Sequence, residues 1–208
     1  MSVNLVKGQK INLSKQDGSS LSRVSLGMNW GAIVKKGVMG FGAKTIPVDL
    51  DASCAVFDND NKVIDIISFR NLRNSWISHS GDDRSGDEDG DDGQDNETIS
   101  VDLSKAPSNA AHVVFFLNSF QGQDFADIPY AAIRVYEGAS RTISNTDPAV
   151  IGKYDVATES KYAGHVSMVM GRLYRRNEGW NFQSIGEPTK DRRLEETVET
   201  IRRSYLAG

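Results

Sequence analysis

The sequence predicts a mainly β fold: a two-sheet β-sandwich with short helices and a C-terminal amphipathic helix. Many short segments alternate apolar and polar residues, as half-buried strands do. Turn-forming residues separate these segments, and helical spacing is found only after Lys190. Short strands with frequent turns and one late helix are typical of a sandwich. We expect the sandwich to span residues 1–188 and the helix, within residues 189–208, to pack on the same domain.

The segments with a strand pattern follow one another along most of the chain. The first two are joined by an Asp-Gly turn at Asp17 and Gly18. His112–Phe120 is the most hydrophobic run, which predicts a central strand buried on both faces. The predicted strands are Lys10–Leu13, Leu21–Met28, Asp49–Phe57, Val63–Phe69, Thr98–Leu103, His112–Phe120, Tyr130–Glu137, Ile151–Ala157, Gly164–Tyr174 and Trp180–Ile185.

Three intervening segments are predicted to be loops or turns. Gly31–Thr45 has the glycines of a surface loop, and it departs from a phosphate-binding loop because Ala43 stands before the lysine. Asp58–Lys62 resembles the start of an EF-hand loop but lacks its later Gly and Glu, so we expect a hairpin turn. Arg70–Ser80 is interpreted as a connector that carries Trp76.

The C-terminal segment has the periodicity of an amphipathic helix. Leu194, Val198, Ile201 and Tyr205 recur at helical spacing, and the charged residues lie on the opposite face. We expect the apolar face to pack on a sheet.

The composition of the 208-residue chain excludes several functional classes. Its net charge of -4 argues against general nucleic-acid binding, which needs a basic face. Its single cysteine, Cys54, can form neither an internal disulfide nor a cysteine-rich zinc site. No signal peptide is recognisable, and no run reaches the roughly 18 apolar residues of a membrane span. We therefore expect a cytoplasmic protein without a transmembrane segment.

Acidity is concentrated in Gly81–Glu97, where nine residues are Asp or Glu and only Arg84 is basic. Such a run is either a solvated loop or a site for a hard cation such as Ca²⁺, which binds six to eight oxygen ligands. Four glycines interrupt it, at positions 81, 86, 90 and 93. Because glycine permits tight turns that bring oxygen atoms inward, this spacing favours the cation site.

Two further carboxylates begin a predicted strand. Asp49 and Asp51 flank Leu50, so their side chains project to the same side of that strand. At about 5 Å, two such charges repel by roughly 3 kcal/mol at an effective dielectric constant of about 20. They therefore point into water, or a cation or hydrogen-bond donors lie between them.

Several motifs resemble the TerD family of bacterial tellurium-resistance proteins, and its TerX and TerZ branch in particular. The resemblance covers Val3 to about Ile185, and the pairing of DLDAS with two G-D-D motifs is specific. In chain order the motifs are DLDASCAVFD, RNLRN, HSGDDRSGDEDGDDG, VVFFLNSF, GQDF, IPYAAIRVYE and GRLYRRNEGWNF.

This resemblance implies a two-sheet sandwich that binds calcium, typically two ions, in loops at one end. The residues that match the family's ligands are Asp49, Asp51, Asp82, Asp83, Asp91, Asp92 and Asp124, with the carbonyl groups of Leu50 and Gly86 as further ligands. The chain departs from the family pattern at Glu88 and Gly93, which leaves the second site and any role of Glu97 open. We expect the four remaining acids, Asp87, Glu88, Asp89 and Asp95, to face water.

Three functions follow from these patterns. In the first, calcium fixes loops that meet a partner. The family is associated with resistance to tellurite, phage and colicins, which implies protein partners of the tellurium-resistance system at the inner membrane. In the second, an incompletely coordinated Ca²⁺ bridges to an anionic ligand or phospholipid headgroup, and Lys35, Lys36 and Lys44 widen the site. The third is a metal-assisted hydrolase with His79 as its base. Because no catalytic signature is present, we expect no enzyme.

Overall fold

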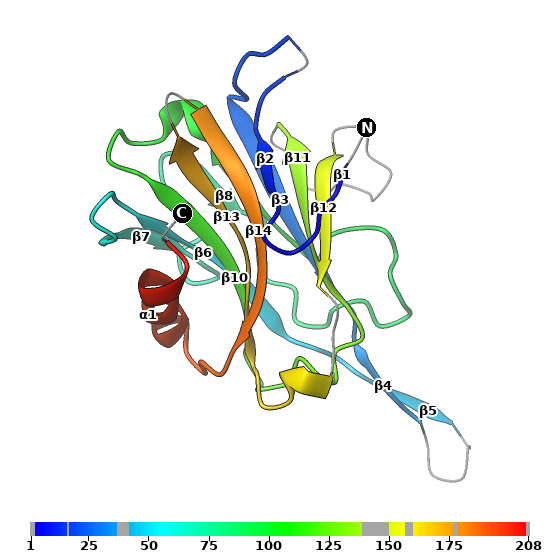
Figure 1. Cartoon of the computed structure of the whole chain (residues 1–208). Coiled ribbons are helices and arrows are strands. Elements are labelled where there is room, and N and C mark those ends of the chain that lie inside the picture. The colour runs from blue at the N-terminus through cyan, green and yellow to red at the C-terminus, as the bar shows by residue number, and fades with distance from the viewer. Residues whose placement is uncertain are drawn as a thin grey trace.

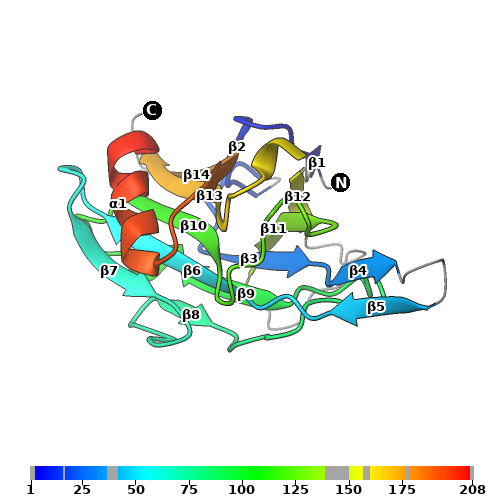
Figure 2. The same ribbon diagram turned by 90° about the horizontal axis from the view of Figure 1, so that it is seen from below.

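The computed structural model describes residues 3–15, 17–36, 42–138, 150–156, 160–176 and 179–206. Within these ranges, two six-stranded sheets face each other, and a helix covers the outer face of one of them (Figures 1 and 2). The first sheet has the strand order β1 (Val3–Asn4), β12 (Val150–Val156), β11 (Ala131–Glu137), β3 (Arg23–Trp30), β9 (Glu97–Asp102) and β8 (Ile77–His79). The second has the order β2 (Lys10–Asn12), β14 (Gly179–Thr189), β13 (Ser167–Arg176), β10 (His112–Ser119), β6 (Leu50–Phe57) and β7 (Val63–Ile67). The predicted two-sheet sandwich is therefore confirmed.

The remaining elements are short. Two 3-10 turns, Leu103–Lys105 and Ser160–Tyr162, follow strands, and the helix α1 spans Leu194–Ser204. A two-stranded arm formed by β4 (Ile33–Lys36) and β5 (Ala43–Ile46) projects from the sandwich (Figure 1). In the described part of the chain, we find no helix with the length and apolar character that crossing a bilayer requires.

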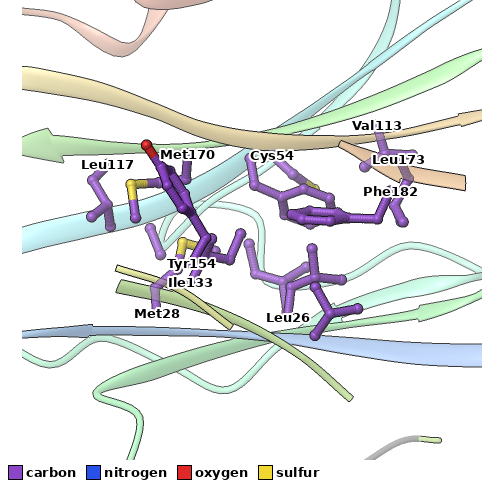
Figure 3. Close-up of a cluster of buried hydrophobic side chains, with 14 of the residues drawn as sticks. Leu26, Met28, Cys54, Val113, Leu117, Ile133, Tyr154, Met170, Leu173 and Phe182 are labelled. Carbon is purple, nitrogen blue, oxygen red and sulfur yellow. The ribbon is translucent and has the colours of Figure 1, made fainter. Parts of the chain in front are cut away.

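The main core lies between the two sheets and is built by the inward-facing residues of each strand (Figure 3). Side chains from the two sheets interdigitate there without exposure to solvent, which makes this contact the main source of hydrophobic stabilisation. The labelled members are Leu26, Met28, Cys54, Val113, Leu117, Ile133, Tyr154, Met170, Leu173 and Phe182. Burial raises the pKa of the Cys54 thiol, so that this residue is an apolar packing group.

The hydrophobic strand β10 contributes to two cores because both of its faces are covered. Phe115 and its alternate neighbours pack between the sheets, whereas Val114 and Phe116 face α1. Val198 and Ile201 of the helix complete this second core. The continuous apolar run thus marks a central strand, as predicted.

A turn at Asp17 and Gly18 joins β2 to β3, as predicted, and the two strands belong to different sheets. Two other local predictions require correction. The expected loop Gly31–Thr45 contains the β4–β5 arm, whose two strands pair from Ile33 to Ile46. The expected connector Arg70–Ser80 contains β8, and its Trp76 is buried.

The topology brings the acidic segments to one end of the sandwich. The stretch Gly81–Glu97 links β8 to β9, and its middle is tied to neighbouring segments by backbone hydrogen bonds. Asp87 pairs with the end of β3, and Val48, just before β6, donates its N–H to Ser85 at 2.8 Å. The stretch is therefore an ordered loop beside the start of β6.

Candidate metal centre

The first acidic group combines Asp49, Asp51 and Asp82. Each offers a carboxylate oxygen, and these atoms lie within 4.8 Å of one another. Asp51 belongs to β6, and Asp49 directly precedes it. Both are buried, whereas Asp82 is exposed on the loop after β8. The same-side arrangement predicted for the β6 carboxylates thus brings them to the acidic loop.

The electrostatics of this first group are unfavourable without a cation. Burial, together with the charges of Glu97, Asp49 and Asp82, raises the pKa of Asp51 to about 7. Burial and the Asp82 charge likewise raise the pKa of Asp49. A carboxyl group with a raised pKa is one whose charged form is poorly stabilised by its neighbours, so a bound cation would relieve the repulsion.

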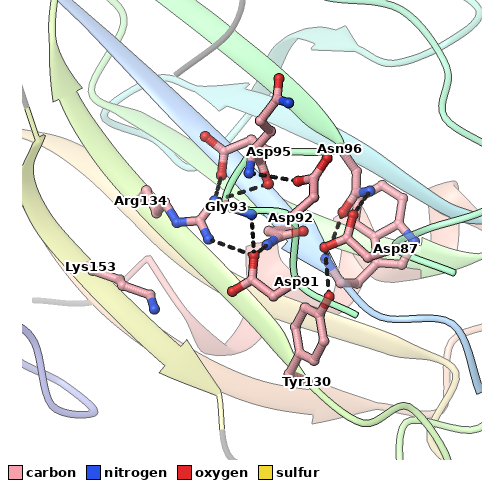
Figure 4. Close-up of polar contacts among 12 residues, drawn as sticks. Asp87, Asp91, Asp92, Gly93, Asp95, Asn96, Tyr130, Arg134 and Lys153 are labelled. Atoms are coloured by element: carbon pink, nitrogen blue, oxygen red, sulfur yellow. Dashed lines mark hydrogen bonds and ion pairs between the residues drawn. The ribbon is translucent and has the colours of Figure 1, made fainter. Parts of the chain in front are cut away.

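The second acidic group combines Asp87, Asp91 and Asp92, whose carboxylate oxygens also lie within 4.8 Å of one another (Figure 4). Asp87 is half-buried, and it accepts hydrogen bonds from Tyr130 Oη at 2.6 Å and from Asn96 Nδ2 at 3.1 Å. Burial is the main cause of its raised pKa. The expectation that Asp87 faces water is therefore wrong.

Backbone amides of the loop orient the other two carboxylates of the second group. Asp91 Oδ1 accepts the N–H of Gly93 at 2.9 Å, and Asp92 Oδ1 accepts the N–H of Gln94 at 2.8 Å. Both side chains remain exposed, with one oxygen each engaged in the turn. Asp91 Oδ1 also accepts the side-chain N–H of Asn29 at 3.1 Å, so both the loop and β3 orient this carboxylate.

A buried ion pair supports the second group from behind. Asp95 accepts hydrogen bonds from Arg134 and from Tyr136 Oη, and the side chains of Asp95 and Arg134 are each 1% exposed. Arg134 Nη2 also lies 3.8 Å from Asp91 Oδ1. Asp95 packs over Gly27, where a Cβ atom would lie 1.9 Å from its Oδ2. The expectation that Asp95 faces water is wrong, whereas Glu88 and Asp89 are exposed as predicted.

Glu97, whose role the sequence left open, connects the loop to both sheets. Its Oε1 accepts the N–H of Asp83 at 2.9 Å, and its Oε2 accepts the N–H of Ala52 at 2.8 Å. His79 Nε2 lies 3.2 Å from the same Oε2 and 2.9 Å from the Ala52 carbonyl oxygen. Glu97 is thus a buried positioning residue between β9, β6 and the acidic loop.

Asp83 and Asp124 belong to neither acidic group in the described part of the chain. Asp83 Oδ1 accepts the N–H groups of Ser85 at 2.9 Å and Gly86 at 3.1 Å, which closes a turn of the loop. Asp124 accepts the N–H groups of Ala126 and Gly164. The structure therefore gives both carboxylates a role in holding loops.

The two predicted carbonyl ligands stay predictions. Leu50 has a buried side chain at the start of β6, and its carbonyl group belongs to the segment that carries Asp49 and Asp51. Gly86 has φ +66° and packs against the Trp30 ring, between the two acidic groups in sequence.

Two residues that lie at the acidic groups, Asp87 and Gln121, were not predicted from the sequence. Gln121 lies beside Asp49 and opposes the rise in the pKa of that carboxyl group, in the loop where Asp124 was the expected ligand. Lys35 and Lys44 lie opposite each other in the backbone ladder of the β4–β5 arm. The cationic side chain beside Asp49 is instead that of Arg84. The only sequence signal for Gln121 was its position directly before the GQDF motif at residues 122–125.

The donor set fits a hard divalent cation. Each group offers three carboxylates, with amide oxygens of Gln121 or Asn29 nearby, and neither includes a cysteine or histidine ligand. Oxygen donors alone suit Ca²⁺ or Mg²⁺, whereas zinc sites use nitrogen and sulfur. Three carboxylates supply up to six oxygens, near the number that Ca²⁺ requires.

Comparisons with known proteins identify the family to which this fold belongs. The family model of the TerD domain matches residues 1–200. Tellurium resistance protein TerZ of Serratia marcescens is 35% identical over 203 residues, which cover 96% of each chain. Stress response protein SCP2 of Bacillus subtilis (strain 168) is 34% identical over 213 residues, 95% of this chain and 98% of that protein.

A solved structure supports the same relationship at the level of the fold. The crystal structure of a homologue of telluride resistance protein TerD from Streptomyces coelicolor A3(2) superposes with a TM-score of 0.62 at 16% identity. The match covers 91% of this chain and 99% of that one. The chain therefore belongs to the TerD domain family of tellurium-resistance and stress-response proteins.

Proposed function

We propose that this protein is a calcium-binding module of a stress response, and that two Ca²⁺ ions order the loops at one end of the sandwich. The observation that carries the proposal is the pairing of two three-carboxylate groups on one loop system. Asp49, Asp51 and Asp82 would hold one ion, and Asp87, Asp91 and Asp92 the other. When bound, each ion would supply positive charge that neutralises these carboxylates.

The chain's own residues give the ordered loops their shape. The side chains of Glu97 and Asp83 accept hydrogen bonds from backbone N–H groups and so fix the first half of the loop. The Asp95–Arg134 ion pair fixes the second half. The cations would then stabilise the exposed side of a scaffold that is anchored on its buried side. Such a surface is suited to binding a protein partner of the tellurium-resistance system, and we propose this role, including partners at the inner membrane.

We further propose that the module is not an enzyme. The histidine nearest the acidic groups, His79, is buried, and both of its ring nitrogens are engaged. Nδ1 accepts the N–H of Gly81 at 3.0 Å, while Nε2 faces the Ala52 carbonyl and Glu97. A general base needs a free nitrogen that can reach its substrate.

Calorimetric titration of the metal-stripped protein with CaCl₂, with Mg²⁺ as competitor, tests the proposal. We expect two calcium ions per chain, with the loss of one in Asp51→Asn and of the other in Asp92→Asn. Asp89→Asn is the matched control, because Asp89 is exposed on the same loop and lies outside both groups. Absence of calcium binding by the native protein would refute the proposal.

A further inference from the structure

The β4–β5 arm is a two-stranded ribbon that belongs to neither six-stranded sheet and projects from the sandwich (Figures 1 and 2). Val34 and Lys35 of β4 are exposed, and so are Ala43, Lys44 and Thr45 of β5. Both faces of the ribbon are therefore open to solvent. A ribbon of two strands is at best marginally stable by itself in water, so a projecting arm of this kind favours a partner that covers one of its faces.

One face of the arm carries a repulsive pair of lysines. Lys35 and Lys44 lie directly opposite each other in the ladder, so their side chains project from the same face. In the described part of the chain, neither ammonium group forms a salt bridge, and residues 33–46 contain no Asp or Glu. Like charges at directly opposite positions destabilise a ladder, so this face favours a partner that supplies anionic groups.

The base of the arm is fixed at the acidic end of the sandwich. Ala32, directly before β4, donates its N–H to the Asp87 carbonyl oxygen at 3.0 Å. Lys44 lies only five residues before Asp49, which is at most about 18 Å of extended chain. A second copy that binds the arm must therefore lie against this end of the sandwich, where its own arm also begins.

A hollow over the first acidic group lies at the same end, and we call it the acidic hollow. Its volume is about 620 Å³, and its lining residues are Asp49, Asp51, Phe69, Asp82, Arg84, Phe120 and Gln121. Three carboxylates face one guanidinium group there, which leaves an excess of two negative charges. Phe69 and Phe120 meet edge to face with their ring centroids 6.3 Å apart, and Phe120 is 63% exposed. An ammonium group in this hollow would gain both ion pairs and contact with an aromatic face.

The charges of the arm and of the acidic hollow match each other. The arm presents two ammonium groups on one face, and the hollow has an excess of two carboxylates. An anionic membrane fits less well, because Gly81–Glu97, with nine acidic residues and one basic residue, lies at the base of the arm and would be repelled. A two-fold axis near that base would place each arm on the other copy, so that both contacts form at once.

We propose that the β4–β5 arm docks into the acidic hollow of a second copy of this chain, and that two copies exchange arms in this way when calcium is absent. Lys35 and Lys44 then neutralise the carboxylates of the other copy's hollow. The docking is independent of calcium binding, and only its reversal by calcium rests on the proposed function, because an ion bound by Asp49, Asp51 and Asp82 would take the place of the lysines.

The contact is small, so we expect a weak dimer. The two strands of the arm have four residues each, and seven residues line the hollow. A standard interface uses about 20–30 residues on each side. We therefore expect a dissociation constant in the micromolar range, which rises with the salt concentration because the contact is largely between charges.

Sedimentation velocity of the metal-stripped full chain, in chelator and at low salt, tests the proposal. We expect a concentration-dependent equilibrium of monomer and dimer, weakened at least about tenfold by Lys35→Glu or by Lys44→Glu. Lys62→Glu is the matched control, because it makes the same change of charge at an exposed position beyond the other end of β6. All three lysines are exposed, so the variants are expected to fold.

A mixture of two charge-reversed variants identifies the surface that receives the arm. Lys44→Glu and Asp82→Lys are each expected to stay monomeric, because each opposes like charges where the arm docks. Mixed together they should form a heterodimer, since the reversed arm of one variant meets the reversed hollow of the other. Asp82 is exposed, so its substitution should leave the fold intact.

Saturating calcium is expected to return the native dimer to monomers. Lys44→Glu should still bind two calcium ions, which separates failure of the docking from failure of the calcium sites. A native chain that stays monomeric in chelator, a dimer that the arm substitutions leave unchanged, or a mixture that stays monomeric overturns the proposal. Arm-dependent sedimentation with phosphatidylglycerol vesicles in place of dimerisation also overturns it, because the arm would then serve a lipid surface.

Discussion

Asp95 and Arg134 form a buried ion pair directly behind the carboxylates of the second acidic group. Burial raises the pKa of Asp95, while Arg134 and Tyr136 oppose that rise. The pair ties an acidic loop to β11 of the first sheet, so the loop is anchored by a charge that lies 39 residues away in sequence.

Removal of this pair should destabilise the fold. In Asp95→Asn, Arg134 would keep its buried charge without its main partner, which typically costs about 3–5 kcal/mol. We expect a loss of that order in the free energy of unfolding, measured by urea denaturation in chelator. Asp89→Asn, an exposed acid on the same loop, should change it by less than about 0.5 kcal/mol. Equal free energies of unfolding for the two variants would show that the ion pair does not contribute to the stability of the fold.

The Asp95 example shows what the sequence could and could not predict. The strand pattern, the central strand β10 and the same-side placement of Asp49 and Asp51 follow from residue periodicity, and the structure confirms them. The acids of the loop are not distinguishable by type or spacing. Which of them is buried depends on Arg134 and Tyr130, which approach from another strand and its preceding loop.

The metal-free protein should become less stable as the pH rises. Burial and the charge of Glu97 raise the pKa of Asp51 to about 7 in the folded chain, from 3.8 for an ordinary aspartate. Because the folded state holds this proton more tightly, the stabilisation is fully present below about pH 4 and is lost as the pH rises through about 7. In chelator, we expect this carboxyl group to lower the free energy of unfolding by at most about 4 kcal/mol between pH 4 and pH 8.

The variant Asp51→Asn isolates that contribution. It should be more stable than the native protein at pH 8 in chelator and equally stable near pH 4, as measured by urea denaturation. Saturating calcium should stabilise the native protein at pH 8 and give the variant a smaller gain. Parallel pH profiles of the two proteins would contradict the assignment of the raised pKa to Asp51.

The polar contact between Asn118 and Thr197 should hold the start of α1 on the second sheet. Thr197 is fully buried, and its hydroxyl group accepts the Asn118 amide. Thr197→Val keeps the shape but removes this acceptor, for a cost of about 1–2 kcal/mol in the free energy of unfolding. Hydrogen exchange of the helix amides should accelerate in the variant. Thr200→Val, at a half-exposed position of the same helix, serves as the control and should leave exchange unchanged.

Gly86 should be required for the packing of the acidic loop. At this position φ is +66°, and an added Cβ atom would lie 2.7 Å from Cδ1 and 2.8 Å from Nε1 of Trp30. Trp30 Nε1 donates to the carbonyl oxygen of Val48, one residue before Asp49. Gly86→Ala must therefore displace the indole ring and disturb the start of β6, so we expect a loss of about 2–3 kcal/mol in the free energy of unfolding.

Gly90→Ala is the comparison that separates packing from backbone strain. Gly90 also has a positive φ, +96°, but nothing lies within 4 Å of an added Cβ atom. Its alanine variant should therefore show only the conformational cost, about 1–2 kcal/mol. Because Val48 leads directly into the first acidic group, Gly86→Ala should also weaken calcium binding at Asp49 and Asp51, which calorimetry would detect, together with a shift in tryptophan fluorescence. If both glycine variants lose the same stability and bind calcium alike, contact with Trp30 does not position the site.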